Sequence, residues 1–335
     1  DIPIRDHEKR GILSLPQIIS FSSNVGIVKM AEKIVSNNLY ATTRSFGFGS
    51  KTGIGLNGES KGKLNPTNSW SAVSLGQIAM GHEVAVTALQ LAMAYSAIAN
   101  GGYLLKPLLI KNILNQSNEI VYEEKSNIIR KISNENTMKE LREILRGVVA
   151  EGTGHNAEVK GWDIAGKTGT AQKFQNGKYS DNQFISNFIG FFPSENPQVL
   201  VFVMLDEPDV PYHWGAEGAA VAFKRIATRI INMDDNIMPP NPKSKTLSEF
   251  KIKEESEFAK SVFNNKDLID LSTQGILRNK MKVPELRGLS LRKAISTLNN
   301  SKLKFNVDGS GKVIWQSPKP GSLVSEGSTI SMGLN

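Results

Sequence analysis

The pattern of apolar residues predicts four helices in the N-terminal two thirds of the chain. Apolar positions recur at helical spacing in 16–35, 137–149 and 218–231. The stretch 84–99 is apolar almost throughout, which favours a buried helix that ends at the Asn-Gly-Gly of 100–102. A polar triplet, Ser22-Ser23-Asn24, interrupts the first of these stretches and is expected at a helix N-terminus.

A different pattern lies between the last two helices and predicts strands. Residues 162–172 are strand-like, 187–193 read NFIGFFP, and 199–205 form an unbroken apolar run. Only the segment 194–197 separates the last two runs, so they are expected to pair as an antiparallel hairpin. The expected fold class is therefore mixed α/β (α+β), with an antiparallel sheet flanked by helices.

Changes in composition divide the 335-residue chain into three parts, and this length is sufficient for two domains. Residues 1–233 carry the predicted helices and strands. Residues 234–281 are charged, polar and proline-containing, which is typical of a linker. Residues 282–335 are expected to form a second, small α+β domain.

Composition also limits the available chemistry. The chain contains no cysteine, which excludes disulfides, thiolate zinc sites and cysteine nucleophiles, and its four histidines are too far apart for a helical His-x-x-x-His ligand pair. Hydroxyls, lysines and carboxylates must therefore carry any catalysis, and no metal or other cofactor is expected. The net charge of +8 favours an anionic partner, either nucleic acid, a membrane surface or an acidic wall polymer. No signal peptide or membrane span is visible in the sequence.

The segment 161–173, GWDIAGKTGTAQK, also matches a phosphate-binding loop. The apolar run that ends in Asp-Glu at 206–207 would then hold the magnesium of a nucleotide. Such a loop needs an apolar strand before it and a helix that starts at its Lys-Thr, but the preceding residues are polar and the following ones have no helical period. No helical crossover fits before residue 187 either. A P-loop nucleotide hydrolase is therefore kept only as a remote alternative.

Two motifs could carry catalysis, and both also have structural explanations. Lys167-Thr168-Gly169-Thr170 lies on a predicted strand, but a second Lys-Thr-Gly at 51–53 stands in a turn-rich, structural setting. Ser22-x-Asn24 could equally be an N-cap. Gly-Thr-Gly at 152–154 either ends a helix or helps to shape a cleft, and the loop 212–215 is expected near the rim of that cleft.

Together these motifs resemble the class B, cell-division type of penicillin-binding protein transpeptidases. The resemblance covers about residues 1–232, and in chain order it is carried by SSNVGIVKMA (22–31), FGFGSKTGIGL (46–56), VTALQLAMAYSAIANGG (86–102), AGKTGTAQK (165–173) and FIGFFP (188–193). It implies the penicillin-binding transpeptidase or serine β-lactamase-like fold. It also implies a peptidoglycan D,D-transpeptidase that acts on D-alanyl-D-alanine stem peptides and is inhibited by β-lactams.

The resemblance further implies a cellular location and partners for the protein. The expected place is the periplasmic or extracytoplasmic face of the bacterial cell membrane, to which an N-terminal anchor outside this chain would attach it. Other cell-division proteins are possible partners, and nucleic acid is not expected. A non-catalytic wall-binding or scaffolding protein with a vestigial cleft remains an alternative.

The same resemblance assigns roles to individual residues. Ser22, Asn24 and Lys167 are the catalytic residues: Lys167 places a positive charge beside Ser22, Ser22 relays a proton toward the leaving amine, and Asn24 hydrogen-bonds the acyl side chain. Thr168 and Thr170 bind the substrate carboxylate through their hydroxyls. The Thr170 N–H forms half of the oxyanion hole.

Because glycine has no side chain, an extended substrate is expected to approach the strand closely at Gly169. The family's nucleophilic serine lies in a Ser-x-x-Lys motif that precedes Ser-x-Asn. All four Ser-x-x-Lys matches follow Asn24, and they are Ser60/Lys63, Ser248/Lys251, Ser290/Lys293 and Ser301/Lys304. The nucleophile is therefore expected upstream of Asp1, so that 1–233 is an N-terminally truncated transpeptidase domain and the chain alone is inactive.

Residues 282–335 resemble one PASTA repeat, a small module with a helix on a three-stranded sheet. The match is carried by Val283-Pro284, by an amphipathic helix with Leu291, Ala294 and Leu298, and by Gln316-Ser-Pro-x-Pro-Gly321. This part has eight basic and three acidic residues. Its basic face either holds an anionic wall polymer or is only the solvated surface of a docking or spacer domain.

Overall fold

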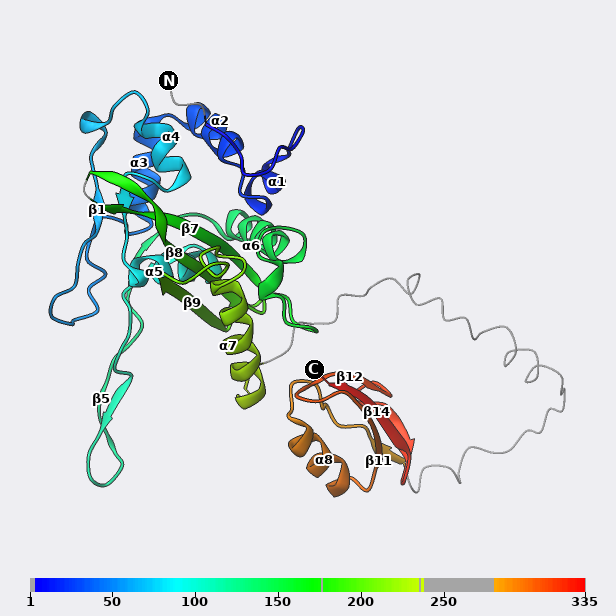
Figure 1. Cartoon of the computed structure of the whole chain (residues 1–335). Coiled ribbons are helices and arrows are strands. Elements are labelled where there is room, and N and C mark those ends of the chain that lie inside the picture. Colours follow the sequence, from blue (N-terminus) through cyan, green and yellow to red (C-terminus); the bar gives the residue numbers. More distant parts are fainter. Residues whose placement is uncertain (1–3, 176, 235, 238–279, 335) are drawn as a thin grey trace. The chain divides into compact units, whose positions relative to one another are not determined.

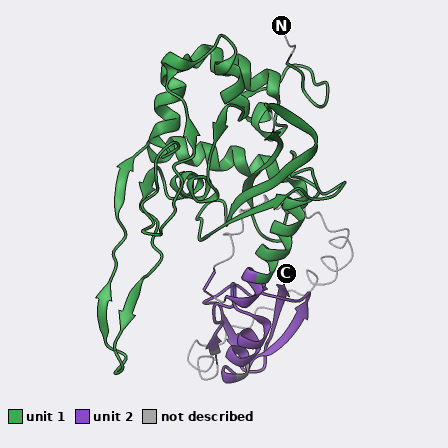
Figure 2. Cartoon of the chain, turned by 60° about the vertical axis from the view of Figure 1, so that its left-hand side comes forward, with its two compact units in different colours: residues 1–229 green, residues 230–335 purple. Residues whose placement is uncertain are grey.

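The computed structural model describes residues 4–175, 177–234, 236–237 and 280–334. The chain forms two compact units, residues 1–229 and 230–335, which are shown in two colours in Figure 2. The linker predicted at 234–281 lies almost entirely outside the described residues. No helix in the described part of the chain is both long enough and apolar enough to cross a bilayer.

The first unit contains seven α-helices in its described residues (Figure 1). They are α1 (Leu15–Ser20), α2 (Asn24–Ile34), α3 (Ser36–Ser45), α4 (Ser74–Met80), α5 (Ala88–Ala99), α6 (Glu135–Ala150) and α7 (Ala219–Met233). Two short 3₁₀ turns, Thr67–Ser69 and His155–Ala157, complete the helical set.

The predicted helices are confirmed with small changes at their ends. The stretch 16–35 is divided at the polar triplet into α1 and α2. The helix predicted at 84–99 begins only at Ala88, because Thr87 is its N-cap: the Thr87 hydroxyl accepts from the N–H of Gln90, and the Gln90 side chain accepts from the N–H of Thr87.

The sheet of the first unit has three antiparallel strands in the order β7-β8-β9. Their bounds are Ala165–Gln175, Lys178–Phe192 and Val199–Asp206. The predicted hairpin between the last two is confirmed, with Phe192 paired to Val199 beside the turn. Strand β8 extends far beyond the predicted run, because its first half pairs with the second half of β7. The order places β7 at an edge of this sheet.

Helices cover both faces of the sheet, as the alternation of side chains along β8 requires. Phe188 and Phe192 point to one face and contact Phe223 of α7, with ring centroids 4.7 and 6.3 Å apart. Phe191 points to the other face and packs with Leu145 of α6 and apolar residues of α5. These three phenylalanines of β8 are fully buried, so the sheet is the centre of the hydrophobic core.

Shorter strands form three small pairs in the first unit. Strand β1 (Lys63–Leu64) pairs with β2 (Val84–Ala85), and β3 (Tyr103–Leu105) pairs with β6 (Ile128–Lys131). Strands β4 (Asn112–Leu114) and β5 (Ile120–Glu123) form a hairpin in which every strand residue is exposed. Figure 1 shows this hairpin projecting away from the helices and the sheet of its unit.

The second unit has the predicted helix-on-sheet architecture. Helix α8 (Leu291–Asn300) packs on a sheet in the order β11-β14-β12, formed by Lys304–Asp308, Thr329–Leu334 and Val313–Ser317. A further pair joins β10 (Lys280–Lys282) to β13 (Leu323–Ser325). The core contains Val283, Leu286, Ala294, Leu298, Leu303, Val313, Ile330, Met332 and Leu334. Lys312, one of the eight basic residues, is fully buried and does not contribute to a solvent-facing basic surface.

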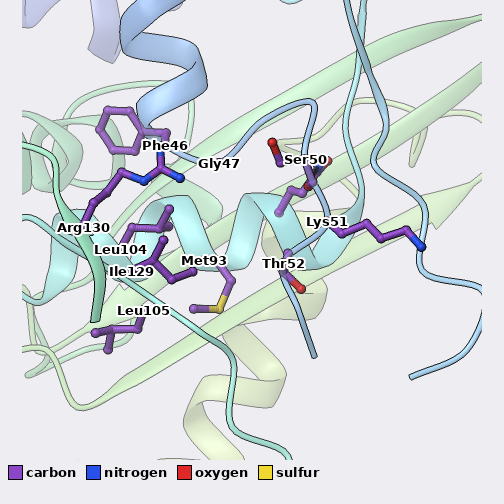
Figure 3. Close-up of a pocket in the computed structure, with 11 residues that line it drawn as sticks. Phe46, Gly47, Ser50, Lys51, Thr52, Met93, Leu104, Leu105, Ile129 and Arg130 are labelled. Carbon is purple, nitrogen blue, oxygen red and sulfur yellow. Dashed lines mark hydrogen bonds between the residues drawn. The ribbon is translucent and has the colours of Figure 1, made fainter. Parts of the chain in front are cut away.

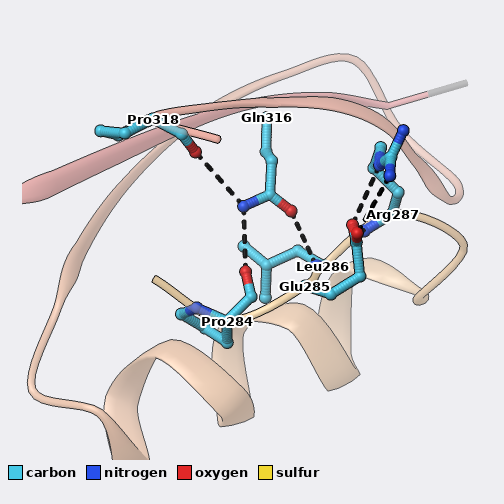
Figure 4. Close-up of polar contacts among 6 residues, drawn as sticks. All are labelled: Pro284, Glu285, Leu286, Arg287, Gln316 and Pro318. Carbon is cyan, nitrogen blue, oxygen red and sulfur yellow. Dashed lines mark hydrogen bonds and ion pairs between the residues drawn. The ribbon is translucent and has the colours of Figure 1, made fainter. Parts of the chain in front are cut away.

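Gln316 connects the start of the second unit to its sheet (Figure 4). Its side-chain oxygen accepts from the Leu286 N–H at 2.7 Å, and its amide nitrogen donates to the Pro284 carbonyl at 3.0 Å. Gln316 is buried, so both backbone groups depend on it for a hydrogen bond away from water. This explains why a glutamine precedes the Ser-Pro sequence of the motif.

Replacing Gln316 with leucine should destabilise the second unit. The Gln316→Leu variant keeps the size of the side chain but leaves a buried donor and a buried acceptor unpaired, which costs about 2–4 kcal/mol in free energy of unfolding. Urea unfolding of the whole chain, followed by methyl NMR signals of Ile330 and Ile189, measures the two units separately. The free energy of unfolding measured at Ile330 should fall, and that measured at Ile189 should stay the same. An unchanged unfolding transition at Ile330 would contradict the role of Gln316.

Candidate active site

The candidate site lies where the junction between α1 and α2 meets the edge strand β7. Lys167 of β7 donates a hydrogen bond from its Nζ to the Oγ of Ser22 at 3.0 Å. The same Nζ donates to the carbonyl oxygen of Thr168 at 3.1 Å and lies 3.4 Å from the Thr168 hydroxyl. Three of the six predicted site residues are therefore in direct contact.

Strand β7 runs straight through the Lys-Thr-Gly-Thr motif. Lys167 pairs with Ile189 and Thr168 with Phe188 in the antiparallel ladder of β7 and β8. No helix begins at Thr168, because the strand continues to Gln175. The phosphate-loop alternative is therefore wrong, since its anion site requires the N–H groups of a helix at this point.

The two adjacent serines have different roles. Ser23 is the N-cap of α2: its hydroxyl accepts from the Gly26 N–H at 2.9 Å and donates to the Asp6 carboxylate at 2.8 Å. Ser22 is exposed, has a positive φ of 56°, and directs its hydroxyl to Lys167. The N-cap explanation of the triplet therefore applies to Ser23 and leaves Ser22 available for chemistry.

Asn24 occupies the first turn of α2, but its amide nitrogen donates to the carbonyl oxygen of Arg5 at 3.2 Å. The neighbouring Asp6 also accepts from the Val25 N–H at 2.9 Å, so the segment before α1 returns to the N-terminus of α2. A carboxylate at this position is stabilised by the free N–H groups of the helix. The sequence pattern gives no signal for this contact, because Asp6 lies outside every predicted element.

Burial changes the proton affinity of Lys167. Loss of hydration lowers the pKa of its ammonium group from 10.5 to about 8. Near neutral pH the side chain is therefore still mainly charged, but it releases a proton far more easily than an exposed lysine. A group of this kind can stabilise an anion and can also exchange a proton with the Ser22 hydroxyl at 3.0 Å.

The two threonines of the motif are held by different neighbours. The Thr168 hydroxyl shares a hydrogen bond of 2.8 Å with the hydroxyl of Thr153, which follows α6. The Thr170 hydroxyl accepts from the Gly215 N–H at 2.9 Å. Gly215 belongs to the loop after β9, so the loop predicted at the cleft rim does contact the motif strand.

Packing within the protein favours glycine at residue 169, in addition to the predicted approach of a substrate, which stays a prediction. A Cβ at this position would lie 2.4 Å from the side-chain oxygen of Asn187, its partner on β8. Gly215 packs against the carbonyl oxygen of Gly169, since a Cβ added to Gly215 would lie 2.5 Å from that oxygen. The glycine therefore makes room for protein atoms on one face of the sheet.

The second Lys-Thr-Gly, at 51–53, is in a loop as expected. Its Thr52 N–H donates to the Glu59 carboxylate at 2.6 Å, and the Thr52 hydroxyl is the main cause that lowers the pKa of that carboxyl. Lys51 and Thr52 border a small cavity of about 80 Å³ (Figure 3). The other lining residues are Phe46, Gly47, Ser50, Gln90, Met93, Leu104, Leu105, Ile129 and Arg130.

Of the four Ser-x-x-Lys matches, Ser60/Lys63 is the one in the described part of the first unit, and the hydrogen bond of its serine is local. Ser60 lies in a loop, where its hydroxyl accepts from the Gly62 N–H, and Lys63 belongs to β1. Ser248 and Lys251 lie outside the described residues. The remaining two matches are in the second unit, which is described separately.

Comparison with known proteins identifies the class to which this fold and site belong. The model of the penicillin-binding protein transpeptidase domain matches residues 1–228, and that of the PASTA domain matches 281–334. The chain therefore belongs to the penicillin-binding protein transpeptidase family. The resemblance to class B members, the predicted α+β fold class and the PASTA repeat are confirmed.

Individual relatives agree with this class. Stage V sporulation protein D of Bacillus subtilis is 34% identical over 328 residues, which are 97% of this chain and 46% of that protein. The probable peptidoglycan D,D-transpeptidase PenA of Neisseria meningitidis is 33% identical over 69% of this chain and 38% of its own length. The chain thus spans less than half the length of these relatives.

Solved structures give the same result. The crystal structure of penicillin-binding protein 3 from Mycobacterium tuberculosis in complex with aztreonam has a TM-score of 0.63 and 31% sequence identity. It covers 71% of this chain, which corresponds to 55% of the crystallised chain. The complex with ampicillin has a TM-score of 0.64 over the same shares.

Replacing Lys167 with methionine should stabilise the first unit near neutral pH. A lysine whose folded pKa is about 8 and whose unfolded pKa is near 10.5 binds fewer protons in the folded state, so its cost is largest below the folded pKa. Lys167→Met should therefore raise the free energy of unfolding by about 1–3 kcal/mol at about pH 7. The advantage should shrink as the pH rises from about 8 toward 10.5, because the lysine of the folded wild type then loses its charge and no longer carries the cost of burying it.

Urea unfolding at several pH values, read at the Ile189 methyl signal, measures this difference. The exposed Lys51 is the matched control, and Lys51→Met should show no such pH-dependent gain. A gap between Lys167→Met and wild type that stays constant from neutral to alkaline pH would rule out a desolvated ammonium group as its cause.

Proposed function

We propose that this chain supplies the α1–α2 wall and the β7 wall of the catalytic cleft of a peptidoglycan D,D-transpeptidase that β-lactams inhibit. The observation that carries the proposal is the 3.0 Å contact between Lys167 Nζ and Ser22 Oγ, at the meeting point of the edge strand and the helix junction. Relatives named as peptidoglycan D,D-transpeptidases and a similar structure with bound β-lactam support it.

The proposed reaction has two acyl-transfer steps. A serine hydroxyl oxygen attacks the carbonyl carbon between the two D-alanines, the peptide bond breaks, and the terminal D-alanine leaves with a proton on its amine. The amine of a second stem peptide then attacks the ester, forms the crosslink and returns a proton to the serine. A β-lactam follows the first step, but its leaving amine stays attached to the acyl group.

The side chains and N–H groups of this chain transfer the proton of that reaction and stabilise its two negative charges, the terminal carboxylate and the oxyanion. Ser22 passes the proton to the leaving amine, and Lys167 supports this transfer because its pKa of about 8 lies close to neutral pH. Thr168 and Thr170 hold the terminal carboxylate, and the Thr170 N–H stabilises the oxyanion. Asn24 holds the acyl side chain, which requires its amide to exchange the Arg5 carbonyl for the substrate.

The attacking serine in this proposal comes from a Ser-x-x-Lys segment outside the chain. The described residues provide no such pair beside Lys167, whose Nζ is occupied by Ser22 and Thr168. The intact enzyme would then work on the extracytoplasmic side of a bacterial membrane, together with other proteins of wall synthesis or cell division. The segment with the nucleophile would complete the cleft opposite β7.

Covalent labelling with a fluorescent penicillin tests the proposal. The chain alone should give no labelled band, because the described residues place no Ser-x-x-Lys pair beside Lys167. A chimera that joins residue 1 to the preceding part of the Bacillus subtilis sporulation protein D should be labelled. Lys167→Ala should lower the labelling rate of the chimera by about 100-fold or more, whereas the matched Lys51→Ala should leave it unchanged.

Two results would overturn the proposal. A label on the isolated chain would mean that one of its own serines is the nucleophile. A labelled chimera with equal sensitivity at Lys167 and Lys51 would mean that the β7 motif has no special part in acylation.

A further inference from the structure

The Gly-Thr-Gly segment 152–154 contacts both walls of the candidate site. The Thr153 N–H donates to the carbonyl oxygen of Ser20, the last residue of α1, at 3.1 Å. The Thr153 hydroxyl lies 2.8 Å from the hydroxyl of Thr168 on β7. One residue therefore joins the helix that leads to Ser22 and the strand that carries Lys167.

Close packing leaves this segment little freedom. A Cβ on Gly152 would lie 2.2 Å from the Ser20 carbonyl oxygen, and one on Gly154 would lie 3.3 Å from the ring of Phe188. Helix α6 also approaches α1 closely, because a Cβ on Gly147 would be 3.2 Å from the Ser20 hydroxyl. The two glycines fix the position of the backbone between them, and with it the position of the Thr153 hydroxyl.

A helix stop does not account for a hydroxyl at residue 153. Helix α6 ends at Ala150, and Glu151 is its C-cap, with an N–H that donates to the Gly147 carbonyl. The Gly154 N–H also satisfies the Val148 carbonyl of the last turn at 2.9 Å, so backbone groups alone make the stop, and the backbone N–H of residue 153 would reach Ser20 with any side chain. The contact between the Thr153 and Thr168 hydroxyls needs a separate reason.

The direction of the hydrogen bonds supplies that reason. A carboxylate can only accept, and so a threonine that binds one must donate its single hydroxyl proton to it. The Thr168 oxygen is then free to accept, and Thr153 is placed at 2.8 Å to donate to it. The Lys167 Nζ also donates to the same oxygen, but its distance of 3.4 Å makes that hydrogen bond weaker than the one of 2.8 Å to Thr153.

We propose that Thr153 is a positioning residue that donates to Thr168 and thereby directs the Thr168 proton toward the carboxylate of the substrate or the β-lactam. The carboxylate part of this role rests on the proposed function. The orientation of the Thr168 side chain by Thr153 does not depend on it.

The orientation can be measured on the chain as it is. Three-bond couplings to the Thr168 methyl carbon report its χ1 angle, and in wild type they should correspond to one rotamer. Thr153→Ser keeps the hydroxyl and should preserve that rotamer. Thr153→Val keeps the shape but removes the donor, so the couplings should change to values averaged over several rotamers, with the other methyl signals unchanged.

Thr153→Ala repeats the test with a smaller side chain if valine disturbs the packing. Single-rotamer couplings of Thr168 in both hydroxyl-free variants would overturn the proposal. This arm gives the same answer whether or not the chain belongs to a functional transpeptidase.

The labelling chimera tests the carboxylate. Thr153→Val should slow labelling by benzylpenicillin roughly tenfold, as expected for one lost hydrogen bond to a charged partner, and Thr153→Ser should restore it. The methyl ester of benzylpenicillin has no carboxylate, so the same variants should leave its slower reaction unchanged. Equal slowing of acid and ester would overturn the proposed role, whereas a wild-type chimera without any label would reject the proposed function itself.

Discussion

The hydrogen bond between Lys167 and Ser22 is the constraint on which the site depends. It joins two residues that are 145 positions apart, one on an edge strand and one at a helix junction. The lysine gives up part of its hydration at this point, which lowers its pKa to about 8 and costs folding free energy. Such a contact persists only if both walls are held rigidly, and the rest of the first unit provides that rigidity.

Each wall is fixed by its own set of contacts. Strand β7 is held by its ladder with β8, whose buried Phe188 and Phe191 attach the sheet to helices on its two faces. The helix wall is held at the N-terminus of α2, where Ser23 and Asp6 satisfy free N–H groups. Thr153 is the residue that touches both walls, since it bonds to Ser20 and to Thr168.

Much of this arrangement could be predicted from the sequence, and the missing parts have a common cause. Apolar periodicity and the short turn at 194–197 were sufficient for α1, α2, α5, α6, α7 and the hairpin of β8 and β9, because these are local patterns. Helices α3 and α4 and the small strand pairs of the first unit were not predicted. The order of the motifs was sufficient to recognise the family, whereas the roles of Lys167 and the other site residues stay predictions. The contacts of Asp6 and Thr153 join segments that are distant along the chain, and no local pattern marks them. The packing of Gly169 against Asn187 is likewise known only once the strand register is known.

The break between α1 and α2 limits how this protein can be made more stable. Ser22 has a φ of 56°, a conformation that strains any residue with a side chain, and this strain interrupts what would otherwise be one long helix. Substitutions that favour continuous helix across 20–24 would relieve the strain and rotate the serine away from β7. Selection for thermal resistance alone would therefore act against the contact between Ser22 and Lys167, and added stability has to come from other parts of the chain.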